Sequence, residues 1–560
     1  MKKRLHYLRF SFLFLLIFSK AKAQDIETIA NQKPFEVSGT FTLFSSYYNV
    51  NGINPRRKDF TWYITGNPNF KIYGIDVPFS LTVSEQERSF RQPFNQFLIS
   101  PSYKWAKLHL GYTNLNWSPF TWSGQTAFGV GVELNPKKFR FGFLYGRLNR
   151  SVEEDLTSLE TQTPAYKRMG FSTRFGYGTD TSHVDLIYLK AKDDEASLNT
   201  IPTKTEVLPA ENVVVGLSSK LKFTEKLFWN ADVAASAYTR DVRAITFTND
   251  EPGFVKTFGS LLQTNSSTQF YKAYQSDISY VEKKFKIKLK YKRVEPDFKS
   301  MGAYYFQTDV ENITLEPSVN ITKYKLRFNS SIGRQKDNLL NQKSFTSKRL
   351  IGNIGADWSP TKYFGINALY SNYSGEQSKG LKIPNQATQQ SYVSQNITVS
   401  PRLTFVKEKI THFHNIVANK QWLTDKNPNT SLLTQYEVNN LNITSAIVFN
   451  KKELTISGSY LLALFDSNAN TNKLNGYSLT ANKAFFDNKL LTNISGSETF
   501  QKLNAEPFSQ MLTISSQNSY KITTHHGVTL LVQYLNNQAK TAAFNSFTEY
   551  NIDLGYTYTF

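Results

Sequence analysis

The feature that most constrains the fold is an alternation of apolar and polar residues that runs from about Glu36 to the C-terminus. It occurs in runs of about 8 to 14 residues and is strictest over residues 549–560. A period of two residues indicates a β-strand with one apolar face and one wet face. No stretch with the 3.6-residue period of an amphipathic helix is comparably strong. We therefore predict an all-β fold.

The segments that connect these runs alternate between two kinds. One kind is short and basic, as at 135–138, 224–226, 282–284, 360–362, 407–409, 450–452 and 487–489. The other is longer and rich in Asn, Ser, Thr, Gly and Asp, as at 192–205, 242–267, 376–390 and 466–472. Short turns at one rim and long loops at the other are typical of bacterial outer-membrane barrels, whose short turns are periplasmic. Aromatic residues beside the short turns fit the girdle of such barrels.

The number of runs gives the size of the barrel. We count about 26, and such barrels have an even number of strands. The prediction is a single transmembrane antiparallel β-barrel of about 26 strands (range 22–28) over residues 36–560, with short periplasmic turns and longer extracellular loops. A chain of β-sandwiches or a propeller would need linkers or a blade repeat, and neither is found. The absence of a long apolar run excludes a multi-helix membrane protein.

The first residues predict export. Residues 1–23 combine a basic start, an apolar stretch over 10–18 and an Ala21-Lys22-Ala23 site, as a cleaved secretory signal peptide does. The apolar stretch is too short to span a bilayer, which disfavours the alternative of a membrane anchor. Residues 24–35 would then form a short periplasmic segment. The chain has no Cys, which excludes disulfides, thiolate metal sites and lipoprotein attachment.

Charge limits the partners. Removing the six cations of residues 1–23 from 65 Lys and Arg leaves 59 against 44 Asp and Glu, a net charge of +15. A basic exported chain is expected to meet acidic lipid and lipopolysaccharide headgroups, polysaccharide or anionic solutes. No nucleic-acid partner is expected.

The last eight residues, 553–560, combine alternation with Gly555, Tyr558 and a terminal Phe560. This pattern resembles the C-terminal β-signal of outer-membrane proteins, which implies the barrel-assembly machinery as a partner during insertion. Three further stretches are Gln92-Pro93-Phe94-Asn95-Gln96-Phe97, Trp117-Ser118-Pro119-Phe120 and the hairpin from Gly129 to Arg150. Together they resemble a segment of large, porin-like outer-membrane barrels of Bacteroidota, a group without a settled activity. About a dozen residues separate the predicted signal peptide from the first strand. A plug domain needs over a hundred, so we expect a bare barrel without energy coupling.

A row of cations is the strongest candidate for function. Five alternate residues share the wet face of one predicted strand, and three more share that of another: Lys284, Lys286, Lys288, Lys290, Lys292, Lys323, Lys325 and Arg327. A lipid-facing Lys costs roughly 2–4 kcal/mol at the bilayer midplane, so these cations should line the lumen. Asp309 and Glu311 on the intervening strand could pair with the lysines. The row is either an anion-attracting wall or an ordinary salt-bridged barrel interior.

The loop 113–126 is the second candidate. Trp117, Phe120 and Trp122 could form a constriction, a sugar-stacking platform or a partner contact, or could pack on the rim of their own barrel. No histidine pair has acidic residues at metal-ligand spacing, and no Ser, His and Asp set stands out. We expect no metal site, no cofactor and no enzyme activity.

These observations favour a porin-like channel for passive or facilitated passage of solutes, with a bias toward anions. The alternative is a non-conducting barrel subunit of an outer-membrane secretion, assembly or polymer-export complex. Transport of lipid or another hydrophobe is a weaker alternative, because it would require an apolar lumen and the lysine row argues against one.

Overall fold

The computed structural model describes residues 33–85, 94–154, 163–202, 207–246, 262, 264–303, 307–322, 325–343, 345–379, 391–542 and 544–560. The predicted signal peptide lies outside the described residues, as does most of the predicted segment 24–35. Within the described part of the chain, no helix is both long and apolar enough to cross a membrane.

The described residues form 29 strand segments in one sheet. The first part contains β1 (Phe35–Ser38), β2 (Thr40–Asn51), β3 (Phe60–Gly66), β4 (Asn69–Ile72), β5 (Ile75–Ser84), β6 (Gln96–Ile99), β7 (Ser102–Tyr103), β8 (Ala106–Asn116), β9 (Ser123–Leu134), β10 (Phe139–Asn149), β11 (Arg168–Gly178), β12 (His183–Asp193), β13 (Glu211–Lys222), β14 (Leu227–Thr239), β15 (Thr268–Val281) and β16 (Phe285–Val294). The second contains β17 (Val310–Ile321), β18 (Leu326–Lys336), β19 (Phe345–Trp358), β20 (Phe364–Lys379), β21 (Ser391–Val406), β22 (Ile410–Asp425), β23 (Tyr436–Phe449), β24 (Leu454–Ser467), β25 (Thr471–Phe485), β26 (Leu490–Leu503), β27 (Glu506–Lys521), β28 (His526–Ala539) and β29 (Phe547–Thr559). The helical elements among the described residues are η1 (Glu195–Ser197), α4 (Ser431–Thr434) and η4 (Asn450–Lys452).

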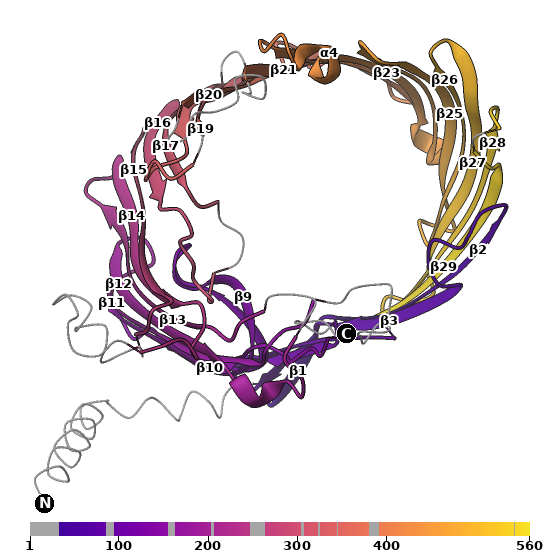
Figure 1. The fold of residues 1–560 in the computed structure, drawn as a ribbon. Coiled ribbons are helices and arrows are strands. Elements are labelled where there is room, and N and C mark those ends of the chain that lie inside the picture. The colour runs from indigo at the N-terminus through magenta and orange to yellow at the C-terminus, as the bar shows by residue number, and fades with distance from the viewer. Residues whose placement is uncertain are drawn as a thin grey trace, which may run out of the picture.

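The sheet closes on itself, as Figure 1 shows. The last strand, β29, pairs with β2 from Thr559 opposite Thr40 to Thr548 opposite Asn51. Three strands are each broken into two segments, β1–β2, β3–β4 and β6–β7, so the 29 segments make 26 antiparallel strands. The predicted fold class and strand number are confirmed. The break at Gly39 requires glycine, because its φ is +114° and a Cβ would lie 2.4 Å from the Asn67 carbonyl oxygen.

The connections define two rims. One rim, here called the turn rim, carries connections of two to five residues: 73–74, 104–105, 135–138, 179–182, 223–226, 282–284, 322–325, 359–363, 407–409, 450–453, 486–489 and 522–525. At the opposite rim, here called the loop rim, the strand ends are joined by the connections 52–59, 85–95, 117–122, 150–167, 194–210, 240–267, 295–309, 337–344, 380–390, 426–435, 468–470, 504–505 and 540–546, of which 380–390 lies wholly and several others partly outside the described residues. The predicted long loop at 466–472 is wrong. The ladder continues to Ser467, whose backbone N–H bonds the Asn470 carbonyl in a tight turn.

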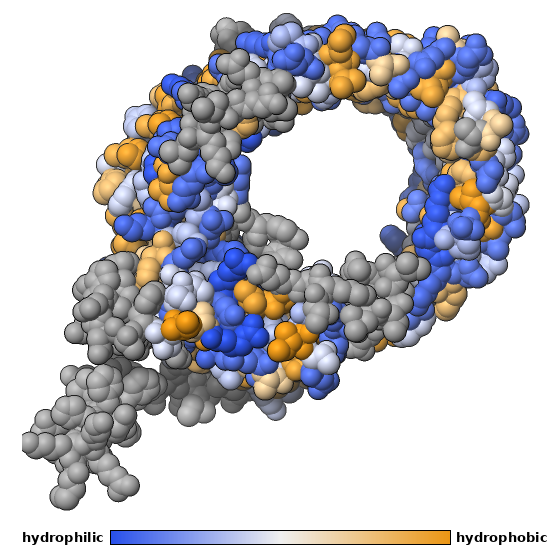
Figure 2. All heavy atoms as spheres, viewed as in Figure 1, coloured by the Kyte–Doolittle hydropathy of each residue, from blue (hydrophilic) through white to orange (hydrophobic). Residues whose placement is uncertain are grey.

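The two faces of the barrel wall differ in polarity. Outward residues are apolar and exposed, as Leu289 (51%), Leu315 (45%) and Leu554 (48%) illustrate. Their neighbours along the strands, such as Lys290, Thr314 and Asp553, face the lumen. The space-filling view shows an opening through the described atoms of the ring (Figure 2). An apolar exterior around a polar lumen is the arrangement expected of a closed barrel in a membrane.

The apolar core lies inside the barrel, against one side of the wall. Inward residues of β10, β12, β13 and β14 contact buried residues from two loops. The centre of this cluster includes Leu144, Ile187, Leu189 and Val214, each 0% exposed. Part of the loop rim is therefore folded into the barrel on this side.

Candidate functional site

The lysine row lies where the alternation predicts it. Lys286, Lys288, Lys290 and Lys292 occupy the inward face of β16, opposite Ser318, Glu316, Thr314 and Asn312 of β17. The outward residues between them are Ile287, Leu289 and Tyr291. Lys284 belongs to the turn 282–284 and stands at the turn rim. Four ammonium groups thus follow one strand through the lumen wall.

Acidic residues accompany this row, but not the predicted ones. Lys288 forms an ion pair of 2.5 Å with Glu316, and Lys290 lies across from Asp277 of β15. Glu311 faces outward and binds Arg293 at 2.6 Å. The prediction that Asp309 and Glu311 pair with the lysines is therefore wrong. It failed because Glu311 lies opposite the outward Arg293 and Asp309 precedes β17.

Asp309 lies at the loop rim and contacts the loop 337–344. It forms an ion pair with Lys343 and accepts a hydrogen bond of 2.9 Å from the backbone N–H of Leu339. Burial tends to raise the pKa of Asp309, but these contacts outweigh burial and lower it overall. The carboxylate therefore joins the loop 337–344 to the start of β17.

The second group of predicted cations does not form a row. Lys323 lies outside the described residues, and Lys325 is exposed in the turn 322–325 with a φ of +46°. Strand β18 begins only at Leu326, so of the three only Arg327 occupies an inward strand position. It lies opposite Asp357, which also accepts a contact of 3.4 Å from Arg402. Of the eight predicted cations, the four that share one strand face within the described part of the chain are those of β16.

The aromatic loop folds into the barrel. The strands β8 and β9 extend further than predicted and leave only residues 117–122 as the loop. Trp122 is 0% exposed, Phe120 1% and Trp117 8%, and all three belong to the apolar core cluster. These rings face neither solvent nor a partner, and they hold the loop against the inner wall.

A second loop, residues 297–303, packs against the loop 117–122, and the sequence analysis did not predict this contact. Ser300 Oγ donates to the Thr121 carbonyl at 2.7 Å, and the Ser123 backbone N–H donates to the Gly302 carbonyl at 2.9 Å. Phe298 is 1% exposed and meets the Phe120 ring edge to face at 6.0 Å. We call residues 117–122 and 297–303 together the inner shelf. The sequence analysis predicted no role for residues 297–303, and the apolar residues Phe298 and Met301 are the signal that could have indicated one.

The wall itself anchors the inner shelf. The Asn212 side chain of β13 accepts from the Met301 backbone N–H at 2.9 Å, and Ser236 Oγ of β14 donates to the Lys299 carbonyl at 2.6 Å. Gly302 fits only as glycine, since a Cβ would lie 2.7 Å from the Thr121 carbonyl oxygen. Backbone and side-chain contacts therefore fix this shelf in one position inside the lumen.

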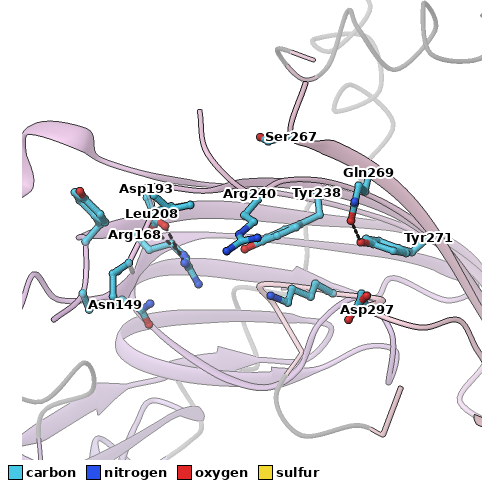
Figure 3. Close-up of a pocket in the computed structure, with 14 residues that line it drawn as sticks. Asn149, Arg168, Asp193, Leu208, Tyr238, Arg240, Ser267, Gln269, Tyr271 and Asp297 are labelled. Carbon is cyan, nitrogen blue, oxygen red and sulfur yellow. Dashed lines mark hydrogen bonds and ion pairs between the residues drawn. The ribbon is translucent and has the colours of Figure 1, made fainter. Parts of the chain in front are cut away.

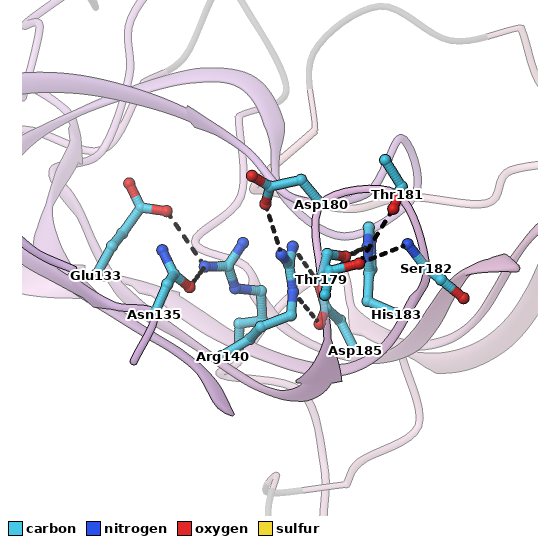
Figure 4. A network of polar contacts seen from close by, with 10 residues as sticks. Glu133, Asn135, Arg140, Thr179, Asp180, Thr181, Ser182, His183 and Asp185 are labelled. Atoms are coloured by element: carbon cyan, nitrogen blue, oxygen red, sulfur yellow. Dashed lines mark hydrogen bonds and ion pairs between the residues drawn. The ribbon is translucent and has the colours of Figure 1, made fainter. Parts of the chain in front are cut away.

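A polar network lies between the inner shelf and the turn rim (Figure 4). Arg140 of β10 donates two hydrogen bonds to Asp185 of β12, at 2.9 and 3.1 Å, and one to the exposed Asp180 at 3.2 Å. Arg174 of β11 contacts Glu133 at 3.3 Å, and its guanidinium lies 5.4 Å from the Trp117 ring centroid. Each of these charge pairs joins two strands that are separated by one intervening strand, β11 for Arg140 with Asp185 and β10 for Arg174 with Glu133.

The C-terminal residues lie at the seam where the barrel closes. Gly555 faces Thr529 and Phe44, and a Cβ there would lie 2.4 Å from Thr529 Oγ1. Phe560 packs edge to face on Tyr558 at 4.9 Å and on Phe41 of β2 at 5.8 Å. Its backbone N–H also donates to the Gly39 carbonyl at 3.0 Å. The terminal aromatic residue therefore joins the last strand to the first.

We predict that Phe560→Ala lowers the fraction of folded barrel in the cell envelope, because it removes the ring that joins β29 to β2. The measurement is the mobility of unheated and heated protein on a detergent gel, since only a folded barrel changes mobility on heating. Phe223→Ala is the matched control, because Phe223 is 60% exposed in a turn away from the seam. Equal folded fractions for the two variants would contradict the prediction.

Comparisons with known proteins concern the fold alone. The chain matches no known protein family and no curated protein sequence. OccAB2 of Acinetobacter baumannii has 10% identity and a TM-score of 0.32, over 68% of this chain and 98% of its own. The P pilus usher (PapC) translocation pore has 10% identity and a TM-score of 0.37, over 94% and 99%. The FrpB iron transporter of Neisseria meningitidis has 11% identity and a TM-score of 0.40, over 93% and 82%.

Proposed function

We propose that the protein is a porin-like channel of the outer membrane that lets solutes cross by passive or facilitated diffusion, with a preference for anions. The observation that carries this proposal is a closed barrel with an apolar exterior and a polar lumen, along which the lysine row of β16 runs. A closed sheet leaves no unpaired edge in the hydrocarbon region, which supports a membrane location. Lipid and lipopolysaccharide would then contact its outer face, and the barrel-assembly machinery would recognise β29.

The inner shelf would let this channel select solutes by size, because it narrows the lumen. A barrel of 26 strands would otherwise enclose a wide aqueous hole. The shelf narrows the lumen from the side of β9 to β16, and its apolar contacts and hydrogen bonds hold it against the wall. Solutes would pass between the shelf and the opposite wall, and the lysine row of β16 would lie at the edge of this passage on the shelf side.

The charge preference depends on how far acids offset the lysines. Glu316 is paired with Lys288, whereas Lys286 and Lys292 lie opposite the neutral residues Ser318 and Asn312 on β17. A side chain of one sign along a pore raises the local concentration of the opposite ion. The row therefore retains positive charge along the lumen wall and favours anions.

Reversing the charge of Lys286, Lys288 and Lys290 to Glu is expected to move ion selectivity from anions toward cations. The measurement is the reversal potential of single channels in a planar bilayer under a salt gradient. The same reversal at Lys362, Lys451 and Lys452, three exposed lysines of the turn rim, changes the net charge equally and is the control. An unchanged reversal potential in the first variant would remove the basic wall as the source of selectivity.

The same bilayer recording tests the proposed function itself. A steady conductance with anion preference supports the channel. A silent barrel would overturn it and support the alternative, a non-conducting subunit of a secretion, assembly or polymer-export complex. Crosslinking in intact cells would then identify its partner.

A further inference from the structure

A cavity of about 780 Å³ opens beside the inner shelf at the loop rim. Its walls are residues from the loop-rim ends of β10, β11, β12, β14 and β15, residues of the adjoining loops such as Arg240, and Asp297 and Lys299 of the inner shelf (Figure 3). This volume falls within the range of roughly 300–1,000 Å³ found for sites that bind small molecules. It therefore has the size of a solute-binding site at the entrance to the lumen.

One cation in this cavity is fixed in place before any ligand arrives. Arg168 donates from Nε to Asp193 Oδ1 at 2.8 Å and from Nη2 to Oδ2 at 2.9 Å. Asp193 is 3% exposed and also accepts from the backbone N–H of Ala210 at 3.0 Å. The buried carboxylate thus uses two of the five guanidinium N–H donors and holds the plane of the group.

Two further cations and aromatic rings surround the same space. The Lys299 ammonium lies 4.8 Å from the centroid of the Tyr238 ring. Figure 3 shows Arg240 directed into the space beside Tyr238 and Arg168. Tyr271, which hydrogen-bonds Gln269, forms a second aromatic wall. Among the described residues that line the cavity, Arg168, Arg240 and Lys299 are the cations and Asp193 and Asp297 the carboxylates, and Arg168 engages Asp193.

From this arrangement we infer that the cavity binds an acidic sugar, a short saccharide that carries a carboxylate, before the solute enters the lumen. The inference rests on the proposed channel and names its substrate class. The cations suit a carboxylate, and guanidinium groups bind it through paired N–H donors. The tyrosine rings offer flat apolar faces for the C–H face of a pyranose, and each carries a hydroxyl. Asn149 and Gln269 supply amide groups for sugar hydroxyls.

The test is titration calorimetry of the full-length barrel in detergent with trigalacturonic acid, and with maltotriose as a neutral sugar of the same length. Lys299→Ala is expected to weaken binding of the acidic sugar roughly tenfold, as for one charge-assisted hydrogen bond. Tyr238→Leu should weaken it also, and Tyr238→Phe should retain most of the affinity. Lys540→Ala, at an exposed loop-rim lysine outside the cavity, is the control. Heat-dependent gel mobility confirms that each variant is folded.

Saturable binding of the acidic sugar alone, weakened by Lys299→Ala but not by Lys540→Ala, supports the inference. Equal binding of both sugars overturns the acidic class, and equal effects of the two lysine variants overturn the cavity as the site. If neither sugar binds, both the acidic sugar as substrate class and the cavity as its binding site are overturned. Conductance of the same preparation separates this inference from the proposed function. A barrel that conducts ions but does not bind the acidic sugar refutes only the proposed binding site in the cavity. A barrel that binds the acidic sugar but does not conduct refutes only the proposed channel function.

Discussion

Replacing Asp185 with alanine is expected to lower the free energy of unfolding of the barrel by about 3–5 kcal/mol. Asp185 is 2% exposed and receives two hydrogen bonds from Arg140, which is itself 9% exposed. Without the carboxylate, the guanidinium keeps its charge in a largely buried position and loses its main partner. The measurement is a urea unfolding curve of the barrel refolded in lipid.

Asp180 provides the matched control, because it contacts the same guanidinium at 3.2 Å with a fully exposed side chain. Solvent screens such a pair, so Asp180→Ala should leave the unfolding curve nearly unchanged. The double variant Arg140→Leu, Asp185→Leu removes both charges and should lose less stability than Asp185→Ala alone. If the Asp180→Ala and Asp185→Ala variants had the same free energy of unfolding, burial would not explain the contribution of the Arg140–Asp185 pair to stability.

The strand number and the inward face of β16 could be predicted because each rests on a local rule. Alternation assigns every residue to one of two faces, and the cost of a lysine in lipid decides which face is inward. The same rule failed at Lys325, because the period of two cannot show where a turn ends. Its φ of +46° belongs to a turn, and β18 starts one residue later.

The inner shelf could be predicted only in part, because its contacts join segments far apart in the chain. Two tryptophans in a short loop indicated that residues 117–122 had a special role. Nothing local to Ser300 or Phe298 shows that they meet Thr121 and Phe120, about 180 residues away. The pairing of Arg140 with Asp185 was hidden for a similar reason. The two residues lie on β10 and β12, and only the register of the intervening β11 brings them together.

Trp122→Ala is expected to destabilise the barrel by about 3–5 kcal/mol and to loosen the inner shelf. Trp122 is 0% exposed and is one of the largest fully buried side chains among the described residues. Its carbonyl also accepts from the Trp117 backbone N–H at 2.9 Å, which shapes the loop around it. Removing the ring leaves a cavity between the loop 117–122 and the wall. The shelf should then leave its position in the lumen for part of the time.

Two measurements on Trp122→Ala separate a loosened shelf from a general loss of stability. Urea unfolding reports the stability, and single-channel conductance reports the width of the lumen. Trp105→Ala is the control, because Trp105 lies in the turn at the other end of β8 and is 39% exposed. A loosened shelf predicts a larger and noisier conductance for Trp122→Ala under conditions where the barrel stays folded, and an unchanged conductance for Trp105→Ala. A destabilised barrel with the conductance of the original protein would mean that the shelf does not form the narrowest part of the lumen. The constriction would then have to be sought elsewhere along the barrel wall.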